Sequence, residues 1–437
     1  MITRAIQIPV VVLLACIATA NRVAAQDHDH DQTAGGNAWS FASDANFIGG
    51  YNYQQRKFAD FWAWESPNWV MASAERQVGR GRLTLNGMFS LEPWTIGRLV
   101  YAHGLGGPER VYAFDSSGRQ QPIGASPQVY QTGESYLGSP LINYQHPHDL
   151  FMELGAAYRF GAGRARYTIE ADLVGAPALG PPPFMHRESA RDNPSVPLTH
   201  HYMDSTHITP GVVTGGVAIG PFMAEASAFR GEEPNDNRLD IDIYPFCSRD
   251  EQSCLTPRLD SWSLRGSWHR GPWSAQVSGG RLHVPEWFEP VDVIRTTASI
   301  GFTGDAWSRP LAVTVGWGHN RDVGLFALDG YLAEWDWRLS RENTCYGRAE
   351  SMVKEIFGLG VHPAGLINHP RNFSQIDSLT LGYVRELPML GWDRLGIGAD
   401  ITVYKTSQDL VEYYGSPKSY HVFLRWRPSG ATPAHIH

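Results

Sequence analysis

After its first 25 residues, the sequence has no long hydrophobic run. Beyond that point nothing approaches the ~18 to 20 unbroken apolar residues that a membrane-spanning helix needs. The run that does exist, from Ile6 to Ala20, follows Arg4 and precedes the small residues Val23-Ala24-Ala25. This order predicts a signal peptide over residues 1–25, with cleavage after Ala20 and an acylated Cys16 as the alternatives. The mature chain is therefore expected to be exported without a helical anchor.

Cysteine is scarce, with four residues in 437. Three of them, Cys247, Cys254 and Cys345, lie beyond the leader, and an exported protein that keeps cysteine usually pairs it. Cys247 and Cys254 lie close together in a polar segment, so we expect a local disulfide between them. Cys345 is expected to be a small residue on a strand. The spacing lacks the short Cys-x2-Cys pairs of a zinc site.

Basic runs, phosphate-binding loops and a Gly-x-Ser-x-Gly elbow are also missing. With a net charge of -8, the chain has no electrostatic footprint for nucleic acid. Without the elbow, the sequence lacks the usual signal of a serine hydrolase. We therefore expect neither a nucleic-acid partner nor an enzyme, and no required cofactor.

What the sequence does have is a repeated strand pattern. Segments of about ten residues alternate apolar and polar side chains, clearly so over residues 150–160, 166–173, 395–403 and 420–427. Each such segment has one apolar face and one mostly polar face. Fifteen strands can be counted from Trp69 to Arg427, and one more is expected within residues 39–64.

Links between these segments alternate in length. Tight turns, such as Gly79 to Gly81, separate long polar segments such as Pro93 to Asp149, Gly175 to Thr206 and Asn320 to Leu328. This alternation, with aromatic residues near strand ends, is typical of outer-membrane barrels. We predict an all-β, antiparallel transmembrane barrel of roughly 16 strands (14–18) with long extracellular loops. A stacked soluble sandwich is the alternative, although its strands are usually shorter.

The barrel prediction divides the chain into four parts. A signal peptide (1–25) and a flexible His- and Asp-containing segment (26–38) precede the barrel (39–427), and a tail (428–437) follows it. The location is the outer membrane of a Gram-negative bacterium, with outer-membrane lipid and the barrel-assembly machinery as partners. The sequence leaves the oligomeric state open.

The polar strand faces would line the lumen. They carry charges of both signs, which a small apolar core would not bury unpaired but a wide, wet barrel would accept. The residues expected to line the pore are Glu153, Arg159, Glu170, Asp172, Arg265, Arg295, Glu334, Asp336, Arg338, Asp400 and Arg425.

Histidines gather in the long links. The two densest groups lie at residues 146–149 and 200–207, and imidazole with nearby carboxylate suits divalent copper or zinc. The candidate metal ligands are His146, His148, Asp149, His200, His201, Asp204 and His207. The alternative is structural, with these side chains bracing loops against the barrel wall. Ser205 among these residues leaves a lipid hydrolase open as a further alternative.

Two segments also carry a resemblance. Gln145-His-Pro-His-Asp-Leu-Phe-Met-Glu-Leu, together with Asp204-Ser-Thr-His-Ile-Thr-Pro-Gly-Val-Val-Thr, resembles a family of uncharacterised bacterial outer-membrane barrels. More loosely, an exported barrel with a His-bearing amino terminus is similar to the outer-membrane copper-resistance B proteins, although this terminus has no methionine. The resemblance implies an outer-membrane location and metal handling, and it assigns no residue role.

The function expected from the sequence is a porin-like channel for small polar solutes or ions. A link to copper or another divalent metal is a hypothesis within that expectation. The alternatives are a barrel hydrolase acting on envelope lipids and a non-enzymatic outer-membrane interaction scaffold.

Overall fold

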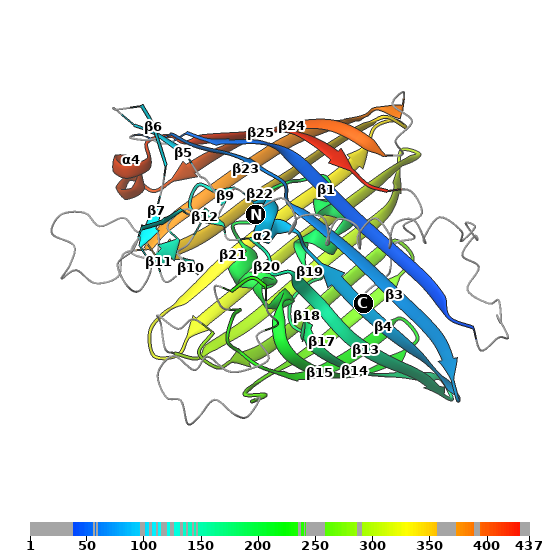
Figure 1. Ribbon diagram of the computed structural model, residues 1–437. Coiled ribbons are helices and arrows are strands. Elements are labelled where there is room, and N and C mark those ends of the chain that lie inside the picture. Colours follow the sequence, from blue (N-terminus) through cyan, green and yellow to red (C-terminus); the bar gives the residue numbers. More distant parts are fainter. Residues whose placement is uncertain are drawn as a thin grey trace, which may run out of the picture.

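A computed structural model shows a closed ring of antiparallel strands (Figure 1). The structure describes residues 38–428, apart from 56, 58–59, 97–100, 105–106, 111, 115–119, 123–125, 132–133, 137–138, 142–143, 146, 235–236, 240, 242–257, 286–290, 356–372 and 389–393. Within these residues, no helix is long and apolar enough to cross a bilayer.

Sixteen strands form the ring. They are β1 (Ser40–Gln54), β3 (Asn68–Val78), β4 (Gly81–Phe89), β13 (Phe151–Ala162), β14 (Ala165–Gly175), β15 (Thr209–Ile219), β16 (Phe222–Phe229), β17 (Ser261–Arg270), β18 (Trp273–Leu282), β19 (Val293–Ala306), β20 (Arg309–Asp322), β21 (Ala327–Arg338), β22 (Asn343–Glu355), β23 (Phe373–Glu386), β24 (Leu395–Thr406) and β25 (Lys418–Trp426).

The first strand closes the ring. On one side of β1, Phe47 to Gln54 pair with Trp426 to Ser419 of β25. On its other side, Ser40 to Phe47 pair with β3, and Gly50 to Gln54 pair with β2 (Asp60–Glu65). The strand expected within residues 39–64 is therefore present, and the prediction of sixteen strands is confirmed.

Short turns at one end of the barrel use backbone conformations that suit tight hairpins. Gly79, Gly163, Gly220 and Gly271 each have a positive φ near 60°, which glycine adopts without steric cost. The turn between β19 and β20 is different, because Trp307 and Ser308 take the positive φ values of 50° and 59° there. The Trp307 side chain is 81% exposed at this turn, where an aromatic ring suits a membrane interface.

The barrel has its apolar side chains outside and its polar side chains inside. On β24, Ile397, Ile401 and Val403 point outward and are 41–48% exposed, whereas Asp400 and Thr402 point inward and are each 6% exposed. A closed barrel satisfies every strand's backbone hydrogen bonds, and an apolar outer face is stable only against lipid. The protein therefore belongs in an outer membrane, as the sequence predicted.

Shorter elements lie in the links. Between β4 and β13 these are α2 (Glu92–Thr95), β5 (Tyr101–Gly104), β6 (Gly107–Arg110), β7 (Tyr112–Phe114), β8 (Gln120–Pro122), β9 (Ser126–Pro127), β10 (Glu134–Tyr136), β11 (Ser139–Leu141) and β12 (Tyr144–Gln145). The helix α4 (Gln408–Tyr414) precedes β25. The prediction of a long link from Asn320 to Leu328 was wrong, since β20 and β21 extend over most of it and only residues 323–326 separate them.

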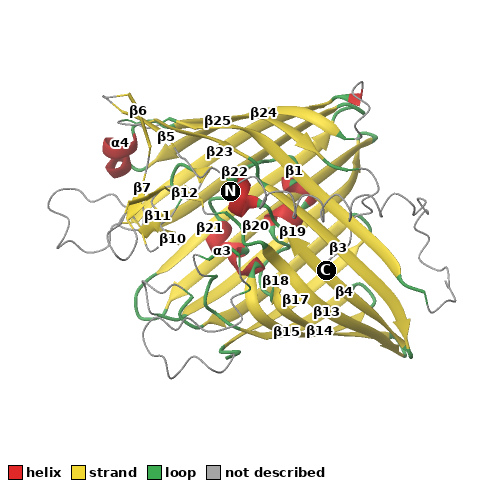
Figure 2. Ribbon diagram, in the orientation of Figure 1, coloured by secondary structure: helices red, strands yellow, loops and turns green. Residues whose placement is uncertain are grey.

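The link between β14 and β15, residues 176–208, lies inside the barrel, and we call it the plug. It contains η1 (Phe184–His186), η2 (Glu188–Ala190), α3 (His200–Met203) and η3 (Ser205–His207). Figure 2 shows short helices, α3 among them, within the ring of strands. Because Gly175 and Thr209 are paired directly, the plug leaves and re-enters the wall at adjacent points.

Several sequence predictions lie outside the described residues. They are the signal peptide, most of the 26–38 segment and of the tail, and the Cys247–Cys254 disulfide. Cys345 is a free cysteine on β22.

Candidate functional site: the plug in the barrel lumen

Arg187 fixes the first half of the plug. Its guanidinium donates to the Oδ2 atom of Asp204 and to the Oε1 atom of Glu334 on β21, both at 2.5 Å. Glu334 also accepts from Arg348 of β22 at 3.0 Å and from Ser189 of the plug at 2.9 Å. All the charged side chains of this group are almost completely buried. Buried charges persist only when paired and hydrogen-bonded, so this cluster fixes the plug to the wall.

A second cluster fixes the middle of the plug. Asp192 accepts a hydrogen bond from Arg425 of β25 at 2.5 Å and lies 3.1 Å from the Nη2 atom of Arg427. Arg425 also pairs with Glu386 of β23, and Arg427 donates to the carbonyl oxygen of Arg191. The plug therefore crosses the lumen from its attachment at β14 and β15 to the opposite wall.

Further hydrogen bonds hold the last third of the plug. The backbone and hydroxyl of Thr199 both donate to Glu350 at 2.9 Å. Arg295 of β19 donates to the hydroxyl of Ser205 at 3.0 Å and to the carbonyl of His201 at 2.7 Å. Ser205 is thus a buried lumenal residue that does not face lipid, and the hydrolase alternative gains no support from its position.

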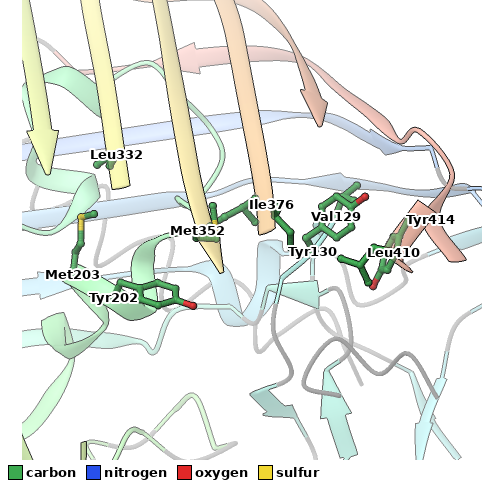
Figure 3. Close-up of a cluster of buried hydrophobic side chains, with 10 residues drawn as sticks. Val129, Tyr130, Tyr202, Met203, Leu332, Met352, Ile376, Leu410 and Tyr414 are labelled. Atoms are coloured by element: carbon green, nitrogen blue, oxygen red, sulfur yellow. The ribbon is translucent and has the colours of Figure 1, made fainter. Parts of the chain in front are cut away.

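Apolar packing adds to the seating of α3. Tyr202 and Met203 belong to a buried cluster that includes Leu332, Met352 and Ile376 of the wall (Figure 3). Glycines make room for it: a Cβ on Gly318 would lie 2.1 Å from the Tyr202 carbonyl oxygen, and one on Gly330 would lie 2.9 Å from its ring. The strands β20 and β21 are therefore shaped to hold the plug.

The residues expected to line the pore lie mainly on the inner wall, where several contact the plug. Arg295, Glu334 and Arg425 bind it directly, and Arg265 reaches the Gly180 carbonyl at 3.4 Å. Asp336 interacts with Asp192 of the plug, while Asp400 is hydrogen-bonded to Tyr346 and His421. Several of these charges thus hold the plug, and Arg295, Glu334 and Arg425 are buried where they do so.

The other residues of this set do not bind the plug in the contacts described. Glu153, Glu170 and Asp172 line a cavity, and Arg159 interacts with Glu170. Arg338 is exposed at the end of β21.

Two cavities flank the plug. One of about 830 Å³, counting its opening to solvent, lies between residues 176–207 and the wall formed by β4, β13, β14 and β17. The other, of about 430 Å³ on the same measure, lies between residues 194–198 and the wall formed by β1 and β22 to β25. Hydroxyl and amide side chains, including Ser378, Thr380 and Gln54, line the second cavity. The two cavities are therefore lined differently.

The structure brings together four of the predicted metal ligands: the three histidines His148, His200 and His207, and Asp204. The ring centroids of His207 and His200 are 4.9 Å apart, those of His207 and His148 are 5.4 Å apart, and the Phe184 ring contacts all three. The Nδ1 atom of each is already bonded: His148 to Glu92 at 2.8 Å, His200 to Asp204 at 2.7 Å and His207 to the Asp204 carbonyl at 2.9 Å.

Of the remaining predicted ligands, the structure describes two, each beside a partner of its own, and the His201 ring also lies 5.5 Å from that of His200. Asp149 accepts from Arg238 at 3.2 Å, His201 lies 3.8 Å from Glu233, and His146 is outside the described residues. In the part of the chain that the structure describes, no group of three or more His, Cys, Asp or Glu side chains could hold a metal ion. The described contacts are those of loop bracing, and the metal site stays a prediction.

Burial sets the charge of the plug. It lowers the pKa of His186 and of His200 to about 4, and it lowers the pKa of His207 well below its ordinary value. For Asp204, burial alone would raise the pKa, but the Arg187 guanidinium outweighs it and holds the pKa well below the usual range. At pH 7 the plug therefore carries neutral imidazoles and ionised carboxylates.

Acidification from pH 7 to 5 is expected to loosen the plug. A released plug would expose His186 and His200, and each would regain an ordinary pKa of 6.5 and bind a proton that the seated plug excludes. Binding of the plug to the barrel wall is thus strongest above pH 6.5 and weakens as the pH falls toward 4. At pH 5, each histidine reduces the free energy of this binding by about 2 kcal/mol. Hydrogen exchange of residues 176–208 checks this, and the same protection at both pH values would contradict it.

Sequence reasoning missed the residues that fix the plug. Arg187 and Asp192 carry no motif, and the one signal available was their charge in a segment without strand periodicity. Arg427 lies on the polar face of the strand pattern over residues 420–427, but it was not among the residues expected to line the pore. Glu92 was missed for the same reason, although it accepts from both the backbone N–H of His148 and its ring.

No family model matches the chain, and no curated protein matches it. Among solved structures it is similar to OmpF of Salmonella typhi in complex with daunomycin (8% identity, 88% of this chain and 97% of that one, TM-score 0.48). It is also similar to the anion-selective porin from Comamonas acidovorans (10%, 89% and 100%, 0.46) and to outer-membrane expressed OmpT of Vibrio cholerae (7%, 91% and 100%, 0.47).

Proposed function

We propose that this protein is a porin-like channel that passes small polar solutes or ions through a lumen narrowed by the plug. The observation that supports this most is the pair of cavities on either side of the plug, inside a sixteen-stranded barrel with a charged inner wall. A barrel of this size is wide enough for water, and its lumenal side chains are those that solvate a polar path. The plug then sets the narrowest passage.

Single-channel recording of the refolded, full-length protein in a planar bilayer tests the proposal. We expect discrete current steps in potassium chloride, because space remains between the plug and the wall. Absence of any current from correctly folded barrels would reject the channel and favour the interaction scaffold. Adding Cu(II) or Zn(II) to each side in turn examines the predicted metal link, since a bound ion near His148 and His200 would change the current from one side.

A further inference from the structure

The larger cavity beside the plug has an acidic wall. Glu153 of β13 and Glu170 and Asp172 of β14 all line it. Their charges interact: both glutamates act electrostatically on Asp172. Three carboxylates in one cavity repel each other, and a cation among them would relieve that repulsion.

Asp172 is a buried residue of this wall, and one of its two carboxylate oxygens accepts no hydrogen bond from a described residue. The residue is 7% exposed, and its Oδ1 atom is buried without a hydrogen-bond partner. Gly155, which pairs with Asp172 across the strands, provides the space: a Cβ there would lie 1.6 Å from that Oδ1 atom. A buried carboxyl group with an unused acceptor is costly, and because Asp172 also lines the cavity it points to a donor supplied by a ligand.

The cations around the cavity are mostly committed to other groups. Arg265 gives two nitrogens to the two oxygens of Glu225, at 2.7 and 2.9 Å. Arg187 is shared by Asp204 and Glu334. His186 and His207 also line the cavity, but burial lowers the pKa of each, so both are neutral at pH 7. Arg159 acts on Glu170, and Glu153 is hydrogen-bonded to the Asn86 side chain. Acidic side chains therefore outnumber the uncommitted basic ones in the lining of the cavity.

Much of the remaining lining is apolar. It comprises Met88 and Met152 of the barrel wall, with Met185, Leu179 and prolines of the plug. A ligand that fits both parts of the lining has a positively charged donor group and an apolar body. A directly coordinated metal ion does not fit, since the described residues include no group that could hold one.

We propose that this cavity binds organic cations, with an ammonium group against Asp172, Glu153 and Glu170 and an apolar portion against the methionines. The proposal names a solute class for the channel and rests on the proposed function for transport, whereas binding itself does not require conduction. Asp172 is the residue that determines specificity, because its carboxylate accepts from the ammonium group.

Equilibrium dialysis of radiolabelled benzylammonium against the refolded, full-length protein in nonionic detergent tests the site, with protein-free micelles as the blank. We expect saturable binding of one benzylammonium per barrel, and benzyl alcohol should not compete for it. Asp172→Asn is expected to weaken binding about tenfold, which corresponds to about 1.4 kcal/mol. The combined Glu153→Gln, Glu170→Gln, Asp172→Asn variant is expected to abolish it.

Two further variants make the result decisive. Gly155→Ala keeps all three carboxylates but displaces that of Asp172, and it should weaken binding as Asp172→Asn does. Glu342→Gln removes a carboxylate whose side chain is 45% exposed, in the link between β21 and β22, and should leave binding unchanged. Heat-modifiable migration on gels verifies that each variant forms the barrel.

The outcomes separate this inference from the channel proposal. Equal affinity in wild type and Asp172→Asn, or no saturable binding, overturns the organic-cation site even if the bilayer shows current. Carboxylate-dependent binding without current supports the site and rejects the channel. Binding that depends on the carboxylates and a current that benzylammonium blocks support both.

Discussion

Excision of the plug is expected to raise the single-channel conductance several-fold. Because Gly175 and Thr209 are directly paired, an Asn-Gly linker can replace residues 176–208 and join β14 to β15 as a tight hairpin. The sixteen strands and their backbone hydrogen bonds are retained. Glu334, Glu350 and Arg425 lose their plug partners but gain water, so the barrel should still close.

A matched deletion controls for loop removal as such. Glu355 and Phe373 are also directly paired, so the same linker can replace residues 356–372 between β22 and β23. This variant keeps the plug, and its conductance should stay close to that of the wild type. Uptake of neutral sugars of increasing size into proteoliposomes provides a second measurement, with a larger size limit only after plug excision. Equal conductance in all three proteins would mean that the plug does not limit the path.

The barrel could be predicted because its pattern is local. Each strand alternates apolar and polar residues, as Leu395 to Val403 do, and the period of two survives without knowledge of any partner strand. The positions of short and long links then fix the neighbours in an antiparallel ring. The link from Asn320 to Leu328 was misjudged because His319, Asn320 and Asp329 are polar, and polar residues near a strand end resemble a loop.

The plug could not be predicted because its contacts are not local. It consists of short helical turns and prolines without a period, and its partners lie far away in sequence: 147 residues separate Arg187 from Glu334, and 233 separate Asp192 from Arg425. The histidines illustrate the same limit. Their types and spacing predicted a metal site in the long links. The folded chain instead places His148, His200 and His207 around Phe184, with each Nδ1 atom bonded to an acceptor.

Arg187→Met is expected to release the plug while leaving the barrel folded. The substitution removes the cation shared by Asp204 and Glu334 and leaves the Asp204 carboxylate buried without its main counter-charge. Breaking a buried pair in this way costs about 3–5 kcal/mol. This cost destabilises the binding of the plug to the wall and not the barrel, because the strands keep their backbone hydrogen bonds. We expect faster hydrogen exchange across residues 176–208 and a larger, noisier current.

Arg191 provides the matched control, since it lies on the same plug only four residues away. Its side chain is 31% exposed and pairs at 2.9 Å with Glu188, which is itself 42% exposed. A pair that is partly exposed contributes less than a buried one, so Arg191→Met should change exchange and current less than Arg187→Met does. Equal effects of the two substitutions would show that charge on the plug, rather than the buried pairing of Arg187, controls its seating. If Arg187→Met alone frees the plug, the buried arginine acts as its principal anchor, and the conductance of the barrel is set by an ion pair that joins the plug to β21.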